Sequence, residues 1–255
     1  MKRILFFALT TLTVPNLRAQ EDTLDLTPVE VKAIRAGNTA PFTKTNITRA
    51  GIEKENLGQD LPFILNRTPS VVASSDAGTG VGYTGIRIRG TDATRINVTL
   101  NGVPFNDAES GGSFFVNLPD FSSSAASIQI QRGVGTSSNG PGAFGATINM
   151  STNEVTKKAY LELSNSFGSF NTLKNTLRAG TGLINEKFTV DARLSRISSD
   201  GYVDRARSDL KAFYVSGAYR HNKSNLRLNV FSGNEETYKA WNGVSGADLK
   251  ERRTY

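Results

Sequence analysis

The chain has 255 residues, no cysteine and a formal net charge of +7, and 38% of its residues are hydrophobic. This length and hydrophobic content suffice for one or two folded domains and argue against a fully disordered protein. The lack of cysteine excludes disulfides, thiolate metal sites, a cysteine nucleophile and lipid attachment to a cysteine.

Residues 1–19 have the three parts of a secretion signal, namely a basic start, an apolar run at 4–14 and a cleavage site expected after Ala19. The apolar run is about half the length of a membrane-spanning helix, and no later stretch approaches that length. Removal of the signal lowers the net charge to +4. Lys and Arg are then spread along the chain, so we expect no nucleic-acid partner.

Residues 20–37 form an acidic and then mixed segment with one short potential strand. In this strand Val29, Val31 and Ala33 alternate with polar neighbours. Pro28 cannot donate a hydrogen bond to a sheet, which favours an edge position. Such a segment can add itself as a strand to the sheet edge of a partner protein. The simpler alternative is a frayed terminus.

Residues 38–153 are predicted to form an α+β domain with long glycine-rich loops. Its second helix should start at Asp60, with Pro62 in the first turn, and stop at Pro69. Thirteen of the 24 glycines lie between Gly78 and Gly145, so the loops can turn sharply or approach another surface closely. The expected strands are 39–47, 86–89, 95–100, 127–131 and 146–150, and the expected helices are 48–56 and 60–67.

Residues 154–255 change to strands of about ten residues with one apolar face. Phe188, Val190, Ala192 and Leu194 show this alternation. The pattern is typical of transmembrane β-barrel strands, although a soluble antiparallel sandwich shows it too. A secretion signal combined with the lack of a membrane-spanning helix favours the barrel over the sandwich. The expected strands are 158–167, 171–180, 187–197, 209–220 and 225–232.

Two glycine-rich stretches do not indicate nucleotide binding. Residues 80–85 fit the GxGxxG pattern, but a strand and not a helix is expected after them. The loop at 133–145 lacks the Lys-Ser/Thr ending of a phosphate-binding loop. His221 is the only histidine, which excludes a histidine metal cluster and leaves a Ser-His-Asp triad without support. We therefore expect no catalytic residue, no metal site and no cofactor, and the protein is not predicted to be an enzyme.

Two stretches resemble the plug domain of TonB-dependent outer-membrane receptors. The first is IRIRG at 86–90 followed by RINVTLNGVPFN at 95–106. The second is IQIQRG at 128–133 followed by GPGAFGATINMST at 140–152. The two matches stand in the family's order and at its spacing, which makes them far more specific than either glycine motif.

Four positions depart from the family pattern. Asn101 replaces the usual aspartate, Gln129 a glutamate, Val134 a proline and Ala146 a glycine. None of these changes removes a chemical group on which transport rests.

The resemblance covers residues 20 to about 233 and implies an α+β plug domain followed by antiparallel transmembrane β-barrel strands. In the family the plug fills a barrel of about twenty-two strands, whose wide lumen would otherwise leak. The five or six strands expected here form an incomplete barrel, and open strand edges in hydrocarbon would leave backbone groups unsatisfied. We therefore expect a fragment or a truncated product.

The resemblance also implies a partner for the N-terminal segment. Residues 26–33 stand in the place of the TonB box, through which TonB, an inner-membrane energy-coupling protein, pulls on the receptor. This agrees with the strand-addition interpretation of the segment. The residues are Leu26, Thr27, Pro28, Val29, Glu30, Val31, Lys32 and Ala33.

Three plug arginines are candidates for charge pairs with carboxylates of the barrel wall. Arg87, Arg89 and Arg132 lie within or beside the family-like stretches. A guanidinium can hold a carboxylate with two hydrogen bonds and release it under force. The alternative is that these side chains face solvent in the lumen.

Two plug loops, 76–84 and 106–115, are expected at the outer end, where they would contact the ligand. Flexible loops on a rigid scaffold are the usual place for recognition, although these loops could instead pack against the barrel wall. Their aromatic rings offer stacking surface and their acidic groups offer charge. The candidate residues are Asp76, Tyr83, Thr84, Asn106, Asp107, Glu109, Phe114 and Phe115.

The resemblance places the protein in the outer membrane, in contact with lipid, as an importer of a scarce nutrient complex. A ferric siderophore or another iron chelate is the first candidate cargo, and cobalamin, haem and oligosaccharide stay open. A preformed chelate brings its own ligands, so a lack of His and Cys clusters does not count against iron. A passive porin and an extracellular binding module are the other classes of protein considered.

Overall fold

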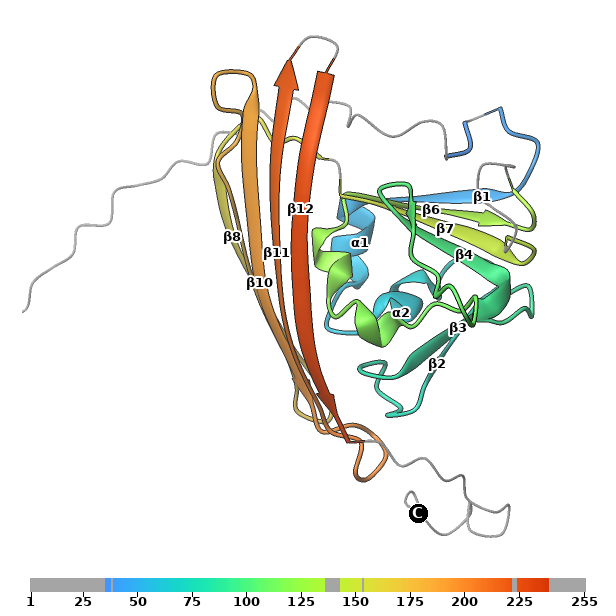
Figure 1. The fold of residues 1–255 in the computed structure, drawn as a ribbon. Helices are drawn as coiled ribbons and strands as arrows, with labels where there is room; N and C mark the ends of the chain where they lie inside the picture. Colours follow the sequence, from blue (N-terminus) through green and yellow to red (C-terminus); the bar gives the residue numbers. More distant parts are fainter. Residues whose placement is uncertain (1–34, 38, 136–142, 153, 222–223, 239–255) are drawn as a thin grey trace, which may run out of the picture.

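The computed structural model describes residues 35–37, 39–135, 143–152, 154–221 and 224–238. The expected secretion signal and residues 26–33 lie outside these ranges. The described chain folds into a plug of mixed α and β structure that lies against one face of a tall curved sheet (Figure 1).

The plug is built on a five-stranded sheet in the order β1-β6-β7-β4-β5. Its neighbouring strands are antiparallel, except that β4 and β7 are parallel. All six residues of the central strand β7 are buried, because both of its edges are paired and both faces are covered. The bounds are β1 Lys44–Thr48, β4 Ile96–Leu100, β5 Val103–Pro104, β6 Ser127–Arg132 and β7 Ala146–Ser151.

Two short helices connect β1 to a separate two-stranded sheet of β2 and β3. Thr48 caps the first helix, since its hydroxyl accepts a hydrogen bond from the backbone N–H of Gly51 at 3.4 Å. The bounds are α1 Arg49–Glu55, α2 Leu61–Leu65, β2 Val71–Ser75 and β3 Thr84–Ile88. Three 3-10 helices complete the plug: η1 Ala93–Arg95, η2 Phe115–Asn117 and η3 Phe121–Ser124.

The predicted plug strands and helices are present, with one shifted start and two further strands, β2 and β5, that were not predicted. The strand expected at 39–47 starts only at Lys44, since Pro41 lacks the N–H that a longer ladder would need. Strand β2 was not predicted, because Val71 and Val72 are followed by Ala-Ser-Ser, which has weak strand propensity. Strand β3 does follow the GxGxxG stretch, so that stretch has no helix N-terminus for a phosphate.

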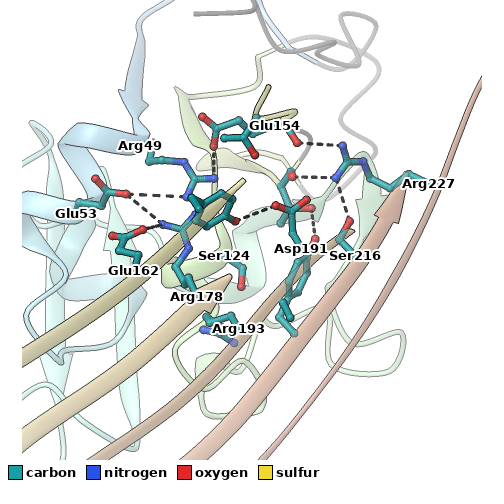
Figure 2. Close-up of a pocket in the computed structure, with 15 residues that line it drawn as sticks. Arg49, Glu53, Ser124, Glu154, Glu162, Arg178, Asp191, Arg193, Ser216 and Arg227 are labelled. Atoms are coloured by element: carbon teal, nitrogen blue, oxygen red, sulfur yellow. Dashed lines mark hydrogen bonds and ion pairs between the residues drawn. The ribbon is translucent and has the colours of Figure 1, made fainter. Parts of the chain in front are cut away.

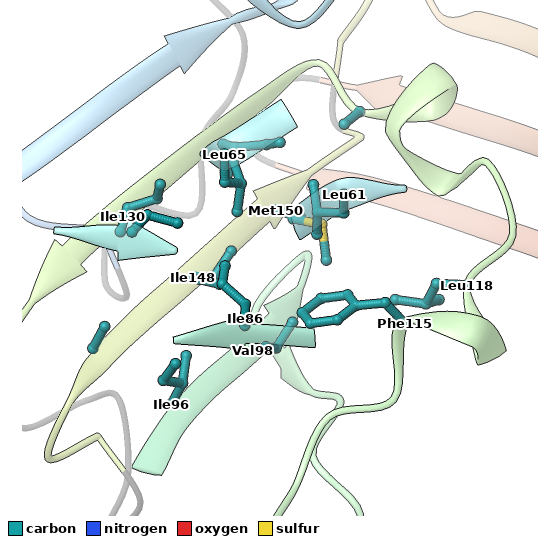
Figure 3. Packing of buried hydrophobic residues seen from close by; sticks show 14 of the residues in the cluster. Leu61, Leu65, Ile86, Ile96, Val98, Phe115, Leu118, Ile130, Ile148 and Met150 are labelled. Atoms are coloured by element: carbon teal, nitrogen blue, oxygen red, sulfur yellow. The ribbon is translucent and has the colours of Figure 1, made fainter. Parts of the chain in front are cut away.

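The plug has one main hydrophobic core between its sheet and its helices (Figure 3). Leu61 and Leu65 of α2 meet Ile148 and Met150 of β7 in this core. Each of these four side chains is at most 6% exposed. The core therefore forms within the plug and does not draw on apolar side chains of the tall sheet.

The tall sheet, called here the wall sheet, contains five strands in the order β12-β11-β10-β9-β8, each antiparallel to its neighbours. All five strands that the sequence predicted are present, and the longest reach 14 residues rather than ten. The bounds are β8 Tyr160–Gly168, β9 Thr172–Gly180, β10 Phe188–Ser199, β11 Ser208–His221 and β12 Ser224–Thr237.

The two faces of the wall sheet have opposite polarity, with the polar face inside. Leu161 and Leu194 are 76% and 60% exposed on the outer face. Lys174 and Arg193, on the face towards the plug, are each only 3% exposed. A soluble sheet buries its apolar face, whereas a transmembrane barrel turns that face to lipid. The wall sheet therefore has the pattern of transmembrane barrel strands. Among the described helices none is long and apolar enough to cross a membrane.

We predict that Leu194→Arg destabilises the protein folded in lipid vesicles by about 2–4 kcal/mol, the cost of a charge on the lipid face near the middle of a strand. Leu194→Phe, which keeps an apolar side chain there, serves as the control. Denaturant unfolding in vesicles measures both variants. Equal stability of Leu194→Arg and the unchanged protein would contradict the assignment of this face to lipid.

Candidate functional site

The plug meets the wall sheet through residues 119–124, a short segment called here the docking segment. Pro119 lies so close to Gly233 of β12 that a Cβ atom on Gly233 would overlap the Pro119 ring. Phe121 packs edge-on against Tyr214 of β11 and Phe231 of β12, with ring centroids 6.4 and 5.4 Å away. The glycine thus provides room for the segment, and the aromatic side chains form an apolar contact beside it.

Asp120 of the docking segment is buried between two cations of the wall sheet. Its carboxylate lies 3.0 Å from Lys174 Nζ and 3.1 Å from an Arg193 guanidinium nitrogen. The same guanidinium also donates to the backbone carbonyl of Asp120. Asp120 adopts a left-handed backbone conformation, with φ 49°, which aspartate tolerates better than most residues.

Plug groups other than Asp120 complete the surroundings of Lys174. Its ammonium group lies 2.7 Å from Asn56 Oδ1 and 3.0 Å from Ser123 Oγ. Ser123 in turn donates to Asp120 at 2.7 Å. The ammonium therefore exchanges water for plug oxygens when the plug is seated, which offsets part of its desolvation.

The two cations set the ionisation of Asp120. Burial alone would raise the pKa of this carboxyl, but Lys174, Arg193 and the hydrogen bond from Ser123 together hold the pKa below its usual value. Asp120 is therefore ionised at neutral pH. Removing the anion would leave two buried cations without a counter-charge, a situation that strongly destabilises a fold.

A polar cavity of about 270 Å³ lies beside the docking segment, between α1 and the wall sheet (Figure 2). Arg178 of β9 contacts Glu53 of α1 at 3.4 Å and Glu162 of β8 at 3.0 Å. Arg49 of α1 pairs with Glu154, just before β8. Ion pairs thus line the cavity, and the Arg178–Glu53 pair joins plug and wall, so that water wets this surface readily.

The loop between β2 and β3 makes a second contact with the wall sheet. The backbone N–H groups of Tyr202 and Val203, in the turn between β10 and β11, donate to the carbonyl of Ala77 at 2.8 and 3.3 Å. A Cβ atom on Gly78 would lie 2.9 Å from Tyr202 Cβ, and φ at Gly78 is +75°. Glycine is therefore required for this close approach.

Two acidic groups face each other across the same contact. Asp60, before α2, accepts a hydrogen bond from Thr84 Oγ1 at 2.9 Å. Both carboxylate oxygens of Glu235 on β12 are buried and accept no hydrogen bond from the described residues. Burial, and after it the charge of Glu235, raises the pKa of Asp60 well above its usual value.

The three arginines predicted to pair with wall carboxylates lie elsewhere. Strand β6 runs away from the wall sheet, and Arg132 stands at its far end (Figure 1). Arg132 donates to the carbonyl of Pro69 at 3.0 Å, and Arg89 donates to Thr43 Oγ1 at 2.8 Å. Arg87 is exposed on β3. Within the described residues none of the three arginines pairs with a carboxylate of β8–β12. Pairing with carboxylates elsewhere in a barrel wall remains a prediction.

The structure separates the predicted ligand residues into exposed and structural ones. Phe115 is 3% exposed in the plug core, so its expected role in stacking on a ligand is wrong; its ring packs with the apolar residues of the core. Asn106 fastens the loop to β4, since its side chain accepts from Val98 N and donates to Ile96 O, each at 2.8 Å. Thr84 bonds Asp60.

Five of the predicted ligand residues are exposed. Phe114 is 51% exposed. Hydrogen bonds from the backbone N–H and the hydroxyl of Ser110 lower the pKa of Asp107, which therefore carries its charge at neutral pH. Asp76, Tyr83 and Glu109 are also exposed. These side chains remain candidates for ligand contact.

Comparison with known proteins gives one family match, over the plug. The TonB-dependent Receptor Plug Domain family matches residues 37–147. A search of curated proteins finds no match.

Several solved structures share the fold at low sequence identity. The copper transporter OprC superposes with a TM-score of 0.64 and 16% identity, over 80% of this chain and 33% of that chain. The unliganded ferric citrate transporter FecA gives 0.63 and 21%, over 84% and 34%. The pyoverdine outer membrane receptor FpvA from Pseudomonas aeruginosa PAO1 gives 0.60 and 16%, over 78% and 29%. The chain thus spans about a third of the length of these proteins.

We predict that Asp120→Ala destabilises the seated plug by about 3–5 kcal/mol, because Lys174 and Arg193 lose their buried counter-ion. Protease resistance of the plug across a urea series measures the loss. Asp209→Ala is the matched control, since it breaks only the Arg196–Asp209 pair, in which Arg196 is largely exposed, and should change little. Equal effects of the two substitutions would contradict the role of Asp120.

We predict that the seated plug loses stability as the pH rises above about 4, the range in which a free aspartate ionises. The raised pKa of Asp60 means that the seated state binds a proton more tightly than the unfolded state, so stability falls until the pH passes the raised pKa. Asp60→Asn, which keeps an acceptor for Thr84, should flatten the dependence in urea titrations at pH 5 and pH 8. The same change in stability between pH 5 and pH 8 in both proteins would contradict this role of Asp60.

Proposed function

Because the chain carries the plug domain of the TonB-dependent receptors and strands with the fold of their barrel wall, we propose that the protein is a TonB-dependent outer-membrane receptor. It imports a scarce nutrient complex. We assign residues 1–19 to the secretion signal, 20–37 to the coupling segment, 38–153 to the plug and 154–255 to the first barrel strands.

The observation that carries the proposal is a plug held on the polar face of a sheet whose other face is apolar. Lys174 and Arg193 are inner-face cations that the plug neutralises through Asp120. A passive porin would have no use for such a contact, because its lumen stays open to water. An extracellular binding module would have no use for the apolar outer face, which lipid covers in a membrane.

A ferric siderophore or another iron chelate is the proposed cargo. Solved structures with this fold include proteins whose names specify ferric citrate and pyoverdine, and one that specifies copper. The described residues contain no group of three His, Cys, Asp or Glu side chains that could hold a bare metal ion. A complete chelate needs instead a stacking and charged surface, which Tyr83, Phe114 and Asp107 provide.

TonB is the proposed source of energy, acting on residues 26–33. A strand that adds to a partner's sheet edge needs its backbone N–H groups, so the contact is sensitive to proline. The plug resists such a pull through its docking segment, where release exposes charged groups that water can solvate. The family consists of transport receptors, and we propose no enzymatic activity for this protein.

We predict that Val31→Pro abolishes growth on the imported iron chelate in an iron-starved strain that carries the full-length gene. Binding of the chelate to whole cells should stay unchanged, since the substitution is remote from the ligand loops. Thr23→Pro, which lies before the predicted box, serves as the control. Growth of the Val31→Pro strain at the normal rate would indicate a passive pore, and parallel tests with siderophores, ferric citrate, haem and cobalamin identify the cargo.

A further inference from the structure

The first described residues are fastened to the middle of the plug sheet. The backbone N–H of Ala36 donates to Gln129 Oε1 at 2.8 Å, and the carbonyl of Ala36 accepts from Gln129 Nε2 at 3.1 Å. Gln129 lies on β6 and is 3% exposed. Its amide group thus pairs with the backbone of the N-terminal segment as a neighbouring strand would, although the two residues are 93 positions apart.

The remaining hydrogen-bonding capacity of this amide is also used. Gln129 Nε2 donates to Asn46 Oδ1 on β1 at 2.8 Å, and Gln129 Oε1 accepts from Gln131 at 2.9 Å. A primary amide has two N–H donors and an oxygen with two lone pairs, and here all four are engaged. Gln129 therefore joins the N-terminal segment, β1 and β6 at one buried point.

Arg35 adds a second fastening beside the first. Its guanidinium donates to Ser127 Oγ at 3.0 Å, to the Ser127 carbonyl at 3.1 Å and to the Asn149 carbonyl at 3.1 Å. These acceptors lie on β6 and β7, in the interior of the plug sheet. A planar guanidinium holds several acceptors in one geometry, which a lysine ammonium does not reproduce.

The position of these contacts along the chain gives them a mechanical role. Arg35 and Ala36 come two and three residues after Ala33, the last residue of the proposed TonB box, and before β1, which starts at Lys44. Strand β1 lies at an edge of the sheet and pairs with β6 over five residues. Without the fastening, a pull on the N-terminal segment would load the Lys44 end of β1 first and open its ladder one pair at a time.

We propose that Arg35 and Gln129 form a force-bearing clamp, which carries the load of a pull on the N-terminal segment to β6 and β7 before β1 is loaded. The clamp rests on the proposed function only in naming TonB as the source of the pull. It must release before β1 can be peeled away, so it sets the first step by which the plug yields.

The clamp also explains why residue 129 is glutamine where the resembling family often has glutamate. A carboxylate can accept from Ala36 N–H, but it cannot donate to Ala36 O or Asn46 Oδ1. It would face the Ala36 carbonyl oxygen with a buried negative charge, which is unfavourable. Gln129→Glu is therefore an isosteric substitution that removes the Gln129 part of the clamp without opening a cavity.

Single-molecule pulling on the full-length protein in a membrane, through a handle at the mature N-terminus, tests the clamp. The unchanged protein should show a small first rupture, distinct from later ones, that frees about eight residues before β1 or at most about 25–30 Å. Gln129→Glu should lower the force of this event strongly, since only the Arg35 contacts then remain, and Arg35→Lys should lower it as well. Gln59→Glu is the matched control, because Gln59 is exposed and its amide donates to the carbonyl of Thr79 in the loop between β2 and β3, away from the N-terminal segment.

Two results would overturn the proposal. One is a first rupture of unchanged force in Gln129→Glu. The other is a first event in the unchanged protein that already releases β1. Arg35→Lys guards against loss of folding, since it keeps the charge and leaves the buried amide in place. The handle replaces TonB as the source of the pull. A failure of TonB-dependent uptake would therefore contradict the proposed function and leave the pulling result unaffected.

Discussion

The inner face of the wall sheet carries charge that cannot stay buried alone, and this constraint governs how the plug is seated. Lys174 and Arg193 point from β9 and β10 into the interior, where Asp120 neutralises them. A buried ion pair contributes little net stability compared with apolar packing, yet losing one partner is costly. The plug is therefore held in a defined position, because Asp120 and the two cations each need the other to stay buried.

This type of interface suits a domain that must stay seated and yet move. The main hydrophobic core lies within the plug and contains no side chain of the wall sheet. Towards the wall it presents ion pairs, hydrogen bonds, the aromatic ring of Phe121 and one small apolar contact, in which Val81 packs with Ile197 and Leu210. Water can replace polar contacts of this kind when the surfaces separate, whereas a broad apolar interface would resist separation. The proposed N-terminal clamp fastens Arg35 and Ala36 to β6 and β7 within the plug and meets an external pull first.

The sequence predicts most of the fold and little of the interface. Period-2 alternation identified all five wall strands, because one apolar face and one polar face leave this pattern in each strand. The same alternation places Lys174 and Arg193 on the inner face, but their partner Asp120 is 54 residues from Lys174 and 73 from Arg193, beyond the reach of any local pattern. Phe115 was misjudged for a related reason. A loop aromatic can point outward or into the core, and tertiary packing decides which.

The chain lacks cysteine, so an engineered pair of cysteines reports the seated geometry directly. Pro119→Cys combined with Gly233→Cys should form a disulfide rapidly on mild oxidation of the folded full-length protein, since these residues touch across the interface. Pro119→Cys combined with Asn234→Cys, whose side chain is directed to the other face of β12, should remain reduced. Absence of the first crosslink, or equal yields of both, would contradict a plug seated on the wall sheet through residues 119–124.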